Sequence, residues 1–348
     1  MASTWKHLHT GRALSKSFFN TKPSKRQQQS FSTTPSSAMN AALLTAWGKP
    51  PKYMTNRPPL PAPSPSQLQL KILAAGVPRA AKGRALGKHS SVQGGLPYDP
   101  SVDGVGLDES TGKKYYIGPL AAPLFAERAN VEKRLITELL PEADPITVAA
   151  LANPVSSSWM ALNVRVIGGI KNRNLLIVGA TSESGRHAAR VARHLGASKI
   201  IGASRTQETL DLVEGLDERI LLTDPISIPK TIGPIDVVLD YVGGPTNIAV
   251  MKAVEIQEGR GLQYVSVGGM AGHENLVIPA SLLNARDIRI VGSGMGGLTM
   301  DDIVKQMPGL VAFLSKIKRP SNVITAPLAD IETAWDSTGE KERLVLIP

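Results

Sequence analysis

The sequence predicts an α/β protein built around an open, doubly wound parallel sheet with helices on both faces. In the middle third of the chain, short apolar segments with the length of buried strands alternate with helical segments, as in successive β-α-β units. The strand segments are mostly apolar, which is typical of strands covered on both faces. The expected strands are 175–178, 199–203, 237–240, 262–267 and 288–291. The expected helices between them are 185–195 and 207–213.

The part of the chain before this region is expected to be irregular and rich in strands. Glycines, prolines and short β-prone pieces dominate 76–130, and a short strand is expected at 40–46. A proline-dense stretch covers 58–65. A rigid connector is favoured there over a proline-rich docking ligand, because an alternating strand follows at 67–72. The pattern becomes helical at 145–162, and we place a domain boundary near there.

The chain of 348 residues contains no cysteine, which excludes disulfides, thiolate nucleophiles and every cysteine-based metal site. Its six histidines do not cluster at metal-ligand spacings, so we expect no metal site. No apolar run approaches the roughly 18 residues of a membrane-spanning helix, and none is expected.

Much of the formal charge of +10 lies in residues 1–38, which are rich in Ser and Thr and contain no Asp or Glu. Their basic residues are Lys6, Arg12, Lys16, Lys22, Lys25 and Arg26. This composition predicts a mitochondrial transit peptide and a matrix location, with a disordered basic tail as the alternative. Translation from Met39 would give a cytoplasmic form. The remaining basic excess is mild, and no aromatic-basic motif indicates a nucleic-acid partner.

A strand, a tight turn and a helix follow one another at 175–189, and this arrangement predicts a Rossmann unit that binds a dinucleotide pyrophosphate. Its geometry points backbone N–H groups at an anion beside the positive end of the helix. Measured against GxGxxG, the turn keeps only the last glycine, Gly185, with Ala180 and Ser182 in the first two places. The surrounding strands and helices therefore carry the prediction. The alternative is a packed turn that binds nothing.

Side chains within the turn favour and oppose this interpretation. Thr181 and Ser184 offer hydroxyl donors for a phosphate, whereas Ser182 takes some room. Glu183 places a carboxylate near the expected pyrophosphate, which is unfavourable unless the side chain points to solvent. The cofactor-binding residues expected from the turn are Gly179, Ala180, Thr181, Ser182, Glu183, Ser184 and Gly185.

The end of the second strand indicates which dinucleotide is preferred. NAD enzymes place an Asp or Glu there for the ribose hydroxyls, but this chain has Ser204, Arg205 and Thr206. An arginine and two hydroxyls suit a 2′-phosphate. NADP(H) is therefore favoured over NAD(H), unless Arg205 only ends the strand in solvent.

Several further segments, taken with the turn, resemble the medium-chain dehydrogenase/reductase superfamily, and specifically its zinc-independent quinone oxidoreductase-like branch. They are LPYDPSVDGVG at 96–106, NPVSSSWMAL at 153–162, DVVLDYVGG at 236–244, VSVG at 265–268 and RLVLIP at 343–348. The resemblance runs from about Asn40 to Pro348. It implies a GroES-like, mostly β catalytic domain into which the Rossmann domain is inserted, with the active site between them.

On this resemblance the chain divides into four parts. Residues 1–38 form the transit peptide or tail, 39–160 the first part of the GroES-like domain, 161–292 the Rossmann NADP-binding domain, and 293–348 the return to the catalytic domain. Zinc-bearing relatives use Cys and His ligands, and the absence of cysteine agrees with the zinc-free branch.

The resemblance also implies functional residues. Ser157 resembles the hydroxyl residue near the nicotinamide, and Val242, Val267, Gly268 and Ser293 would line the path of the cofactor. Relatives usually carry glycine at the positions of Ser101 and Ser182.

Members of this branch pass a hydride from NADPH to a quinone or to an α,β-unsaturated carbonyl, so the same reaction is expected here. A proton must also reach the product. The candidates are His89 and Tyr98. His89 lies where related enoyl reductases carry a catalytic tyrosine, and an imidazole there could donate a proton near neutral pH. A surface histidine without a role is the alternative.

Two other functions remain open from the sequence. One is a mitochondrial enoyl-thioester reductase of lipid synthesis, which the missing tyrosine disfavours. The other is a non-catalytic nucleotide-binding sensor or scaffold, suggested by Ser101, Ser182 and Glu183. The expected partner is a small-molecule substrate, with a homodimer as the default assembly.

Overall fold

The structure, a computed structural model, describes residues 38–269, 271–272, 275–337, 339 and 342–348. The expected transit peptide lies outside the described residues, apart from its last position. Within this part of the chain, no helix is both long and apolar enough to cross a membrane.

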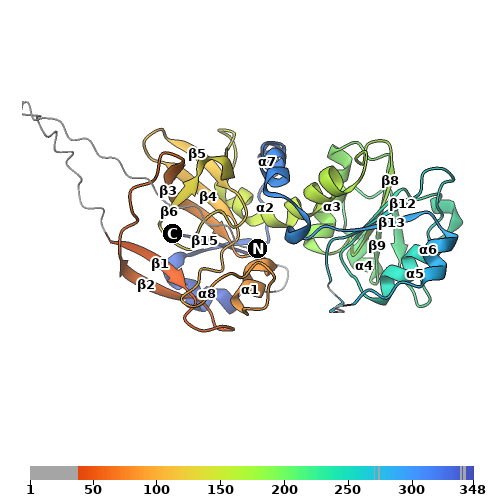
Figure 1. Cartoon of the computed structure of the whole chain (residues 1–348), viewed down its shortest axis with the longest axis horizontal. Coiled ribbons are helices and arrows are strands. Elements are labelled where there is room, and N and C mark those ends of the chain that lie inside the picture. Colours follow the sequence, from red (N-terminus) through yellow and green to blue (C-terminus); the bar gives the residue numbers. More distant parts are fainter. Residues whose placement is uncertain (1–37, 270, 273–274, 338, 340–341) are drawn as a thin grey trace, which may run out of the picture. The chain divides into compact units, whose positions relative to one another are not determined.

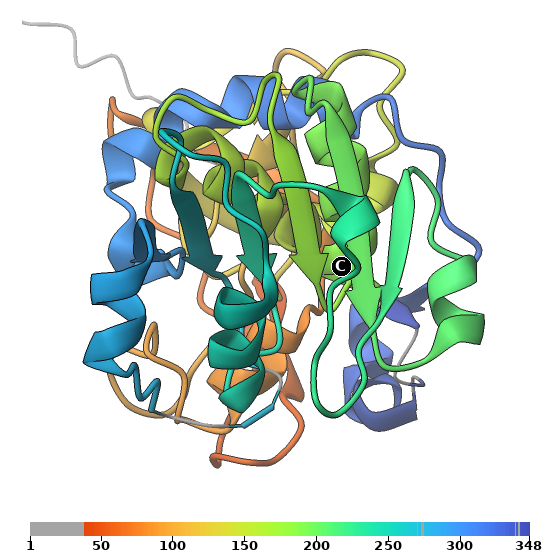
Figure 2. The same ribbon diagram turned by 90° about the vertical axis from the view of Figure 1, so that its right-hand side faces the viewer.

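The middle of the chain forms a six-stranded sheet whose strands are all parallel, as Figure 2 shows. In chain order the strands are β8 (Asn174–Val178), β9 (Lys199–Ser204), β10 (Glu218–Leu221), β11 (Val237–Asp240), β12 (Leu262–Ser266) and β13 (Ile288–Gly292). In space they follow the order β10-β9-β8-β11-β12-β13. The order reverses between β8 and β11, and dinucleotides bind at this kind of reversal.

Helices cover both faces of this sheet, because successive side chains of a strand point to opposite sides. On β8, Leu175 and Ile177 pack into one core cluster together with α3 (Glu183–His194). Leu176 and Val178 pack into another cluster together with α5 (Pro245–Ala253). Two shorter helices complete the domain, α4 (Gln207–Asp211) and α6 (Ala280–Ala285). The predicted doubly wound parallel sheet is confirmed.

A second, seven-stranded sheet belongs to the mostly β part of the molecule. Its order is β14-β15-β3-β4-β5-β7, and β6 also pairs with β3. The strands are β3 (Gln67–Gly76), β4 (Gly104–Asp108), β5 (Lys113–Ile117), β6 (Arg128–Glu132), β7 (Ile136–Glu138), β14 (Val323–Pro327) and β15 (Arg343–Ile347). β15, at the C-terminal end, pairs antiparallel with β3, as Figure 1 shows. The chain therefore returns to its first sheet after completing the Rossmann domain, as the resemblance implies.

α2 (Pro145–Met160) packs against β3 and β4 of this sheet and also against α3 of the Rossmann domain. Its first turn is capped by Asp144, whose carboxylate accepts hydrogen bonds from the N–H groups of Ile146 and Thr147. A π-helical turn, Ala161–Arg165, continues it. The boundary predicted at 160 therefore falls inside a helical segment, and the exact domain limits stay predictions.

The remaining elements are β1 (Met39–Leu43) and β2 (Lys52–Arg57), which pair with each other, and the helices α1 (Arg79–Ala85), α7 (Met300–Leu314) and α8 (Ile331–Ser337). The sequence patterns missed α1. The proline-dense stretch 58–65 contains no strand or helix. The helix expected from 185 begins at Glu183, and the helix expected to reach 213 ends at Asp211.

Candidate functional site

The turn after β8 is held to the neighbouring strand by its own backbone. Gly179 has a φ of 86°, which favours glycine. The N–H groups of Gly179 and Ala180 both donate to the Ala203 carbonyl oxygen of β9, at 3.0 and 3.1 Å. These two donors are used within the protein, so an anion must be bound by the groups that follow them.

Ser182 caps the helix that follows the turn. Its hydroxyl accepts a hydrogen bond from the Gly185 N–H at 3.1 Å and donates to the Gly179 carbonyl at 2.8 Å. The N–H groups of Glu183 and Ser184 belong to the first helical turn and have no intrahelical acceptor. They are the donors that the turn can offer to a phosphate.

Gly185 allows α3 to approach the turn closely. A Cβ at this position would lie 2.8 Å from the Ala180 Cα, a separation that packed atoms do not adopt. Gly202 of β9 also leaves room for the turn, because a Cβ there would lie 3.0 Å from the Ala180 Cβ. The turn therefore retains the glycine that close helix–strand packing requires, although the pattern has lost its other glycines.

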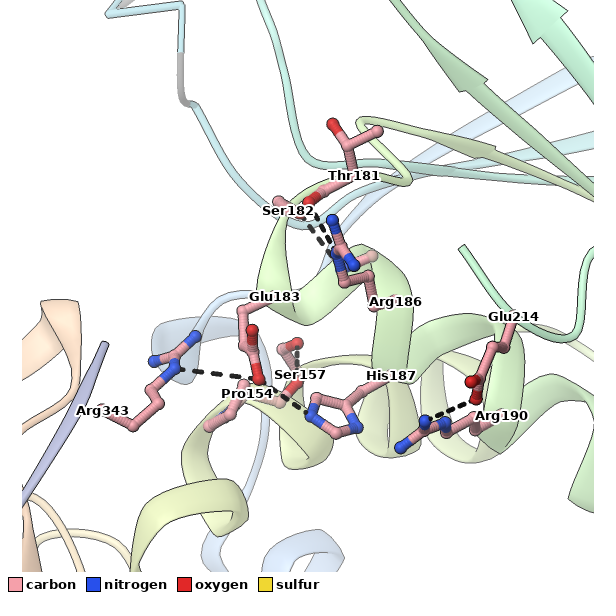
Figure 3. A network of polar contacts seen from close by, with 11 residues as sticks. Pro154, Ser157, Thr181, Ser182, Glu183, Arg186, His187, Arg190, Glu214 and Arg343 are labelled. Carbon is pink, nitrogen blue, oxygen red and sulfur yellow. Dashed lines mark hydrogen bonds and ion pairs between the residues drawn. The ribbon is translucent and has the colours of Figure 1, made fainter. Parts of the chain in front are cut away.

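The side chain of Glu183 points away from the turn and toward β15, as Figure 3 shows. Its Oε1 lies 3.2 Å from the His187 Nε2 and 3.8 Å from the Arg343 Nε. Burial alone would raise the pKa of Glu183, but the His187 hydrogen bond and the nearby Arg343 charge lower it below its usual range. From the sequence, this carboxylate is unfavourable in the turn unless it points to solvent. It is instead paired inside the protein, so it does not face a bound phosphate.

Arg186 is a cofactor-binding candidate that the sequence analysis missed. Its Nε donates to the Thr181 carbonyl oxygen at 3.1 Å, and Figure 3 shows the guanidinium lying against the turn. An arginine here offers further donors and a positive charge to a pyrophosphate. Its position directly after the last glycine of the turn was the available signal.

A groove of about 460 Å³ begins at the turn and follows the ends of β9 and β10. Its lining includes five of the predicted cofactor residues: Gly179, Thr181, Ser204, Arg205 and Val242. The Thr181 and Ser204 hydroxyls lie 3.1 Å apart. Arg205 is exposed and forms no ion pair with any described residue. This arrangement fits the adenosine end of a dinucleotide and leaves the Arg205 charge free for a 2′-phosphate.

The residues that line the groove differ from the predicted set at Thr206 and Asp224. Thr206 is the residue that precedes α4 and does not line the groove, although the sequence analysis grouped it with Arg205. Asp224 does line the groove, and the sequence analysis did not select it. Its carboxylate suits a ribose hydroxyl better than a phosphate.

The other predicted cofactor residues lie at the carboxyl ends of the strands or on α2. The N–H groups of Val267 and Gly268 donate to the Asp240 carbonyl at 2.8 and 3.1 Å. Ser293 follows β13, and its buried hydroxyl has no hydrogen-bond partner among the described residues. The Ser157 hydroxyl donates to the Pro154 carbonyl of α2 at 2.8 Å. A buried unpaired hydroxyl at this edge of the sheet fits a polar ligand there, so the residues present fit a dinucleotide.

A separate, more enclosed cavity of about 110 Å³ lies between the seven-stranded sheet, α2 and α7. Its walls are mostly apolar and include three methionines. The lining residues are Ala80, Arg84, His89, Ser91, Val102, Tyr116, Pro119, Leu120, Asn153, Ser156, Met160, Met295, Leu298, Ile303, Met307 and Leu310. Such a cavity suits a small, largely apolar molecule with few polar groups.

His89 lines this cavity, and its contacts indicate a neutral imidazole with its proton on one particular nitrogen. Its Nδ1 accepts a hydrogen bond from the Ser91 N–H at 3.2 Å and lies 2.8 Å from the Ser91 hydroxyl. Arg84, only 7% exposed, donates to that hydroxyl at 2.8 Å. Burial and the Arg84 charge lower the pKa of His89. The ring proton therefore sits on Nε2, which forms no hydrogen bond with the described residues.

Tyr98, the second predicted catalytic residue, does not line the cavity. Its ring packs on Trp47 with centroids 5.4 Å apart, and the Arg84 guanidinium carbon lies 5.1 Å from its ring centroid. Burial raises the pKa of its hydroxyl. Tyr98 therefore packs against Arg84 and lies outside the lining of the cavity that a substrate could enter.

Two polar residues beside the cavity were missed by the sequence analysis. The Tyr116 hydroxyl donates to the Asp103 Oδ2 at 3.1 Å, and Asp103 is 1% exposed. Burial raises the pKa of Asp103 to about 7. Asp103 stands inside the segment at 96–106 on which the resemblance was based. The position of this aspartate directly before the apolar strand residues 104–107 was the available signal.

Ser101, where relatives usually have glycine, has a local structural role. Its buried hydroxyl accepts a hydrogen bond from the Leu124 N–H at 2.9 Å. Within the described ranges, no group of three or more His, Asp or Glu side chains could hold a metal ion.

Comparison with known proteins identifies the family, although no protein-family model matches the chain. A probable NADPH-dependent quinone reductase, tdiC, of Emericella nidulans is 42% identical over 355 aligned residues, which cover 89% of this chain and 100% of the relative. An acryloyl-coenzyme A reductase of Sulfurisphaera tokodaii is 28% identical over 170 residues, covering 48% of this chain and 49% of the relative.

Solved structures show the same fold. The quinone oxidoreductase of Thermus thermophilus superposes with a TM-score of 0.69 at 22% identity, covering 89% of this chain and 100% of that one. A mycobacterial quinone oxidoreductase gives a TM-score of 0.72 at 18% identity with the same coverage. With its two sheets, its modified phosphate turn and a full-length relative at 42% identity, the chain belongs to the zinc-independent, quinone oxidoreductase-like branch of the medium-chain dehydrogenase/reductase superfamily.

Proposed function

We propose that this protein is an NADPH-dependent oxidoreductase that reduces a quinone or an α,β-unsaturated carbonyl compound. The observation that carries the proposal is the pairing of a dinucleotide groove containing Arg205 with an enclosed apolar cavity containing His89. The probable quinone reductase at 42% identity supports the same reaction.

Within this proposal each group has a defined task. When bound, NADPH supplies the hydride. The N–H groups of Glu183 and Ser184, together with Arg186, bind the pyrophosphate, and Arg205 binds the 2′-phosphate. The apolar walls of the cavity exclude water and orient the acceptor. His89 donates a hydrogen bond from Nε2 to a carbonyl oxygen of the acceptor, which polarises it.

The proposal is tested by following NADPH oxidation against a panel of quinones and enones. We expect saturable turnover with at least one acceptor and a clear preference for NADPH over NADH. His89→Gln should lower kcat and leave the NADPH dissociation constant unchanged, because His89 lies in the acceptor cavity and not in the groove. Saturable NADPH binding without turnover on any acceptor would indicate a nucleotide sensor instead.

We also propose that residues 1–38 direct the protein to the mitochondrial matrix. Their acid-free, basic and hydroxyl-rich composition supports this. The full chain should enter isolated mitochondria only when the membrane potential is intact, and a chain beginning at Met39 should stay outside. Equal import of both chains would contradict the proposal.

A homodimer is the assembly that we propose. β13 is an outer strand of the six-stranded sheet, and no strand in the described part of the chain pairs with its outer edge, which is where a second copy would pair in the proposed dimer. Analytical ultracentrifugation should give twice the mass of the chain, and a monomer at micromolar concentration would reject the dimer.

A further inference from the structure

Asp103 and Tyr116 form a buried acid pair that the function described above does not use. Tyr116 lies on β5, and Asp103 directly precedes β4, the antiparallel neighbour in which Val105 lies opposite Tyr116. Asp103 stands two residues before Val105, so its side chain leaves the sheet on the same face. This face packs against α2 and α7, and Tyr116 lines the cavity between them.

Within the described residues no positive charge stabilises an ionised Asp103, and the Tyr116 hydrogen bond only partly offsets the effect of burial. Its only hydrogen bond within the described part of the chain comes from Tyr116, and its Oδ1 is buried without a partner. It forms no ion pair there. Asp144 is the opposite case, because both its oxygens accept hydrogen bonds from Arg319 and its pKa falls to about 2. Burying an unpaired carboxylate is costly. The Asp103 carboxyl therefore keeps its proton at pH values at which exposed carboxyl groups are ionised.

His89, on the wall of the same cavity, is poorly suited to supply that proton. A neutral imidazole releases a proton only with great difficulty, and the imidazolium that could release one is disfavoured by burial and by Arg84. Two further titratable groups lie beside Arg84: Tyr98, whose pKa is raised by burial, and Asp99, which accepts hydrogen bonds from the Ser101 and Phe125 N–H groups. Neither of them lines the cavity.

We propose that Tyr116 is the group that protonates the reduced acceptor and that Asp103 is the positioning residue that returns a proton to Tyr116. This inference rests on the proposed reductase function and assigns the proton donor that the function leaves open. His89 keeps the role of orienting the carbonyl oxygen through its Nε2–H group.

The step balances for a quinone acceptor. The quinone gains two electrons and one proton as the hydride from NADPH, which leaves as NADP⁺. Burial and the Asp103 charge raise the pKa of Tyr116 well above its ordinary value, so the Tyr116 hydroxyl gives its proton to the oxygen that becomes anionic, where an O–H bond forms, only as the Asp103 proton replaces it. The Asp103 carboxyl proton passes to the Tyr116 oxygen in the same step, which reverses the resting hydrogen bond from Tyr116 to the Asp103 Oδ2. Asp103 is 1% exposed and does not line the cavity, so water that enters the cavity after the product leaves reprotonates it through Tyr116. The net reaction consumes one quinone, one NADPH and one proton.

The proposal is tested with four variants and the dependence of kcat on pH. In the wild type, kcat should fall as the pH rises through about 7, because Asp103 loses its proton there. Asp103→Asn should lower kcat by about 10²-fold and remove this fall, and Tyr116→Phe should lower kcat similarly. Tyr115→Phe, on the same strand but packed on the opposite face of the sheet, is the matched control and should behave as the wild type.

His89→Gln separates the two candidate donors. This variant should keep the fall in kcat near pH 7, since the titrating group is still present. If the fall persists in Asp103→Asn and disappears in His89→Gln, the proposal is overturned. NADPH binding should be unchanged in every variant. A lower kcat accompanied by weak NADPH binding or by a lost thermal transition would indicate a misfolded variant. A second measurement, on the wild-type protein, then decides whether Asp103 is protonated.

That second measurement is infrared difference spectroscopy of the protein without substrate. A carbonyl band of a protonated buried carboxyl group should titrate near pH 7, be absent in Asp103→Asn and shift in frequency in Tyr116→Phe. Wild-type protein that gives this band but reduces no acceptor would reject the proposed function and leave the acid pair established. An active wild type without the band would reject the acid pair and leave the function.

Discussion

In the proposed cofactor site, single residues decide which dinucleotide the groove accepts. Arg205 is exposed at the end of β9 and lines the groove together with Ser204, while Asp224 faces the same space from the loop after β10. A 2′-phosphate gains a charge-assisted hydrogen bond from the guanidinium. The cost of placing it near a carboxylate is smaller where both groups reach solvent, because water screens them.

Replacing Arg205 with Ala should therefore weaken NADPH binding much more than NADH binding. A lost hydrogen bond to a charged group corresponds to about 1.5–3 kcal/mol, or roughly ten- to a hundredfold in the dissociation constant. Fluorescence titration measures both affinities. Arg190→Ala is the matched control, because Arg190 is also exposed but pairs with Glu214 outside the groove. Equal losses for NADPH and NADH would contradict the assignment of Arg205.

The roles of Glu183, Tyr98 and His89 depend on contacts that the sequence does not show. Glu183 appears in the sequence as an unfavourable charge in a phosphate turn, yet its carboxylate is bound by His187 and Arg343, and Arg343 is 160 positions away along the chain. Tyr98 and His89 were equal candidates in the sequence, but only His89 lines the cavity. Side-chain direction at such positions is set by long-range packing, which local composition does not encode.

At the level of elements, α3 begins two residues earlier than the sequence pattern indicated. The apolar periodicity of the helix becomes regular only after Gly185, whereas its hydrogen-bonded start is defined by the Ser182 cap. Ser182 therefore has a stabilising function in the turn, and the glycine usual in relatives is not needed to close it.

Ser182→Ala should lower the free energy of unfolding by about 1 kcal/mol, because the Gly185 N–H loses its acceptor. Ser182→Gly should cost only a few tenths of a kcal/mol, since glycine is itself tolerated at a helix N-cap. Chemical denaturation of the two variants measures the difference. If both substitutions destabilise the protein equally, the hydroxyl does not act as the cap.

At the scale of the whole molecule, the ion pair between Glu183 and Arg343 joins the cofactor helix α3 to the C-terminal strand β15, as Figure 3 shows. Burial lowers the pKa of Arg343, and the Glu183 charge opposes this effect. The pair is therefore one physical connection between the helix that begins at the phosphate turn and the sheet that carries the acceptor cavity.

Glu183→Gln should destabilise the protein by about 1–2 kcal/mol at neutral pH, between the values for exposed and fully buried pairs. The pKa of Glu183 in the folded chain is lower than its ordinary value of 4.5, so its contribution is complete above that pH and is lost as the pH falls below it. Wild type and variant should therefore converge in stability in acid. The double variant with Arg343→Met should be less destabilised than the sum of the two single variants, and simple additivity would show that the pair contributes nothing.

The sequence by itself determined the parallel sheet, its position in the middle of the chain and the turn that receives a dinucleotide. These follow from local signals, because buried parallel strands are short and apolar and a phosphate turn lies between one strand and the next helix. In the structure, the Ser182 cap and the contact of Arg186 with the Thr181 carbonyl hold this turn, although most glycines of the usual pattern are absent. Only the tertiary structure decided that β15 closes the first sheet, that Glu183 faces Arg343, and that Asp103 is buried beside Tyr116 without a counter-charge. Each of these depends on contacts between distant segments, and the energy of a buried charge is set by everything that surrounds it.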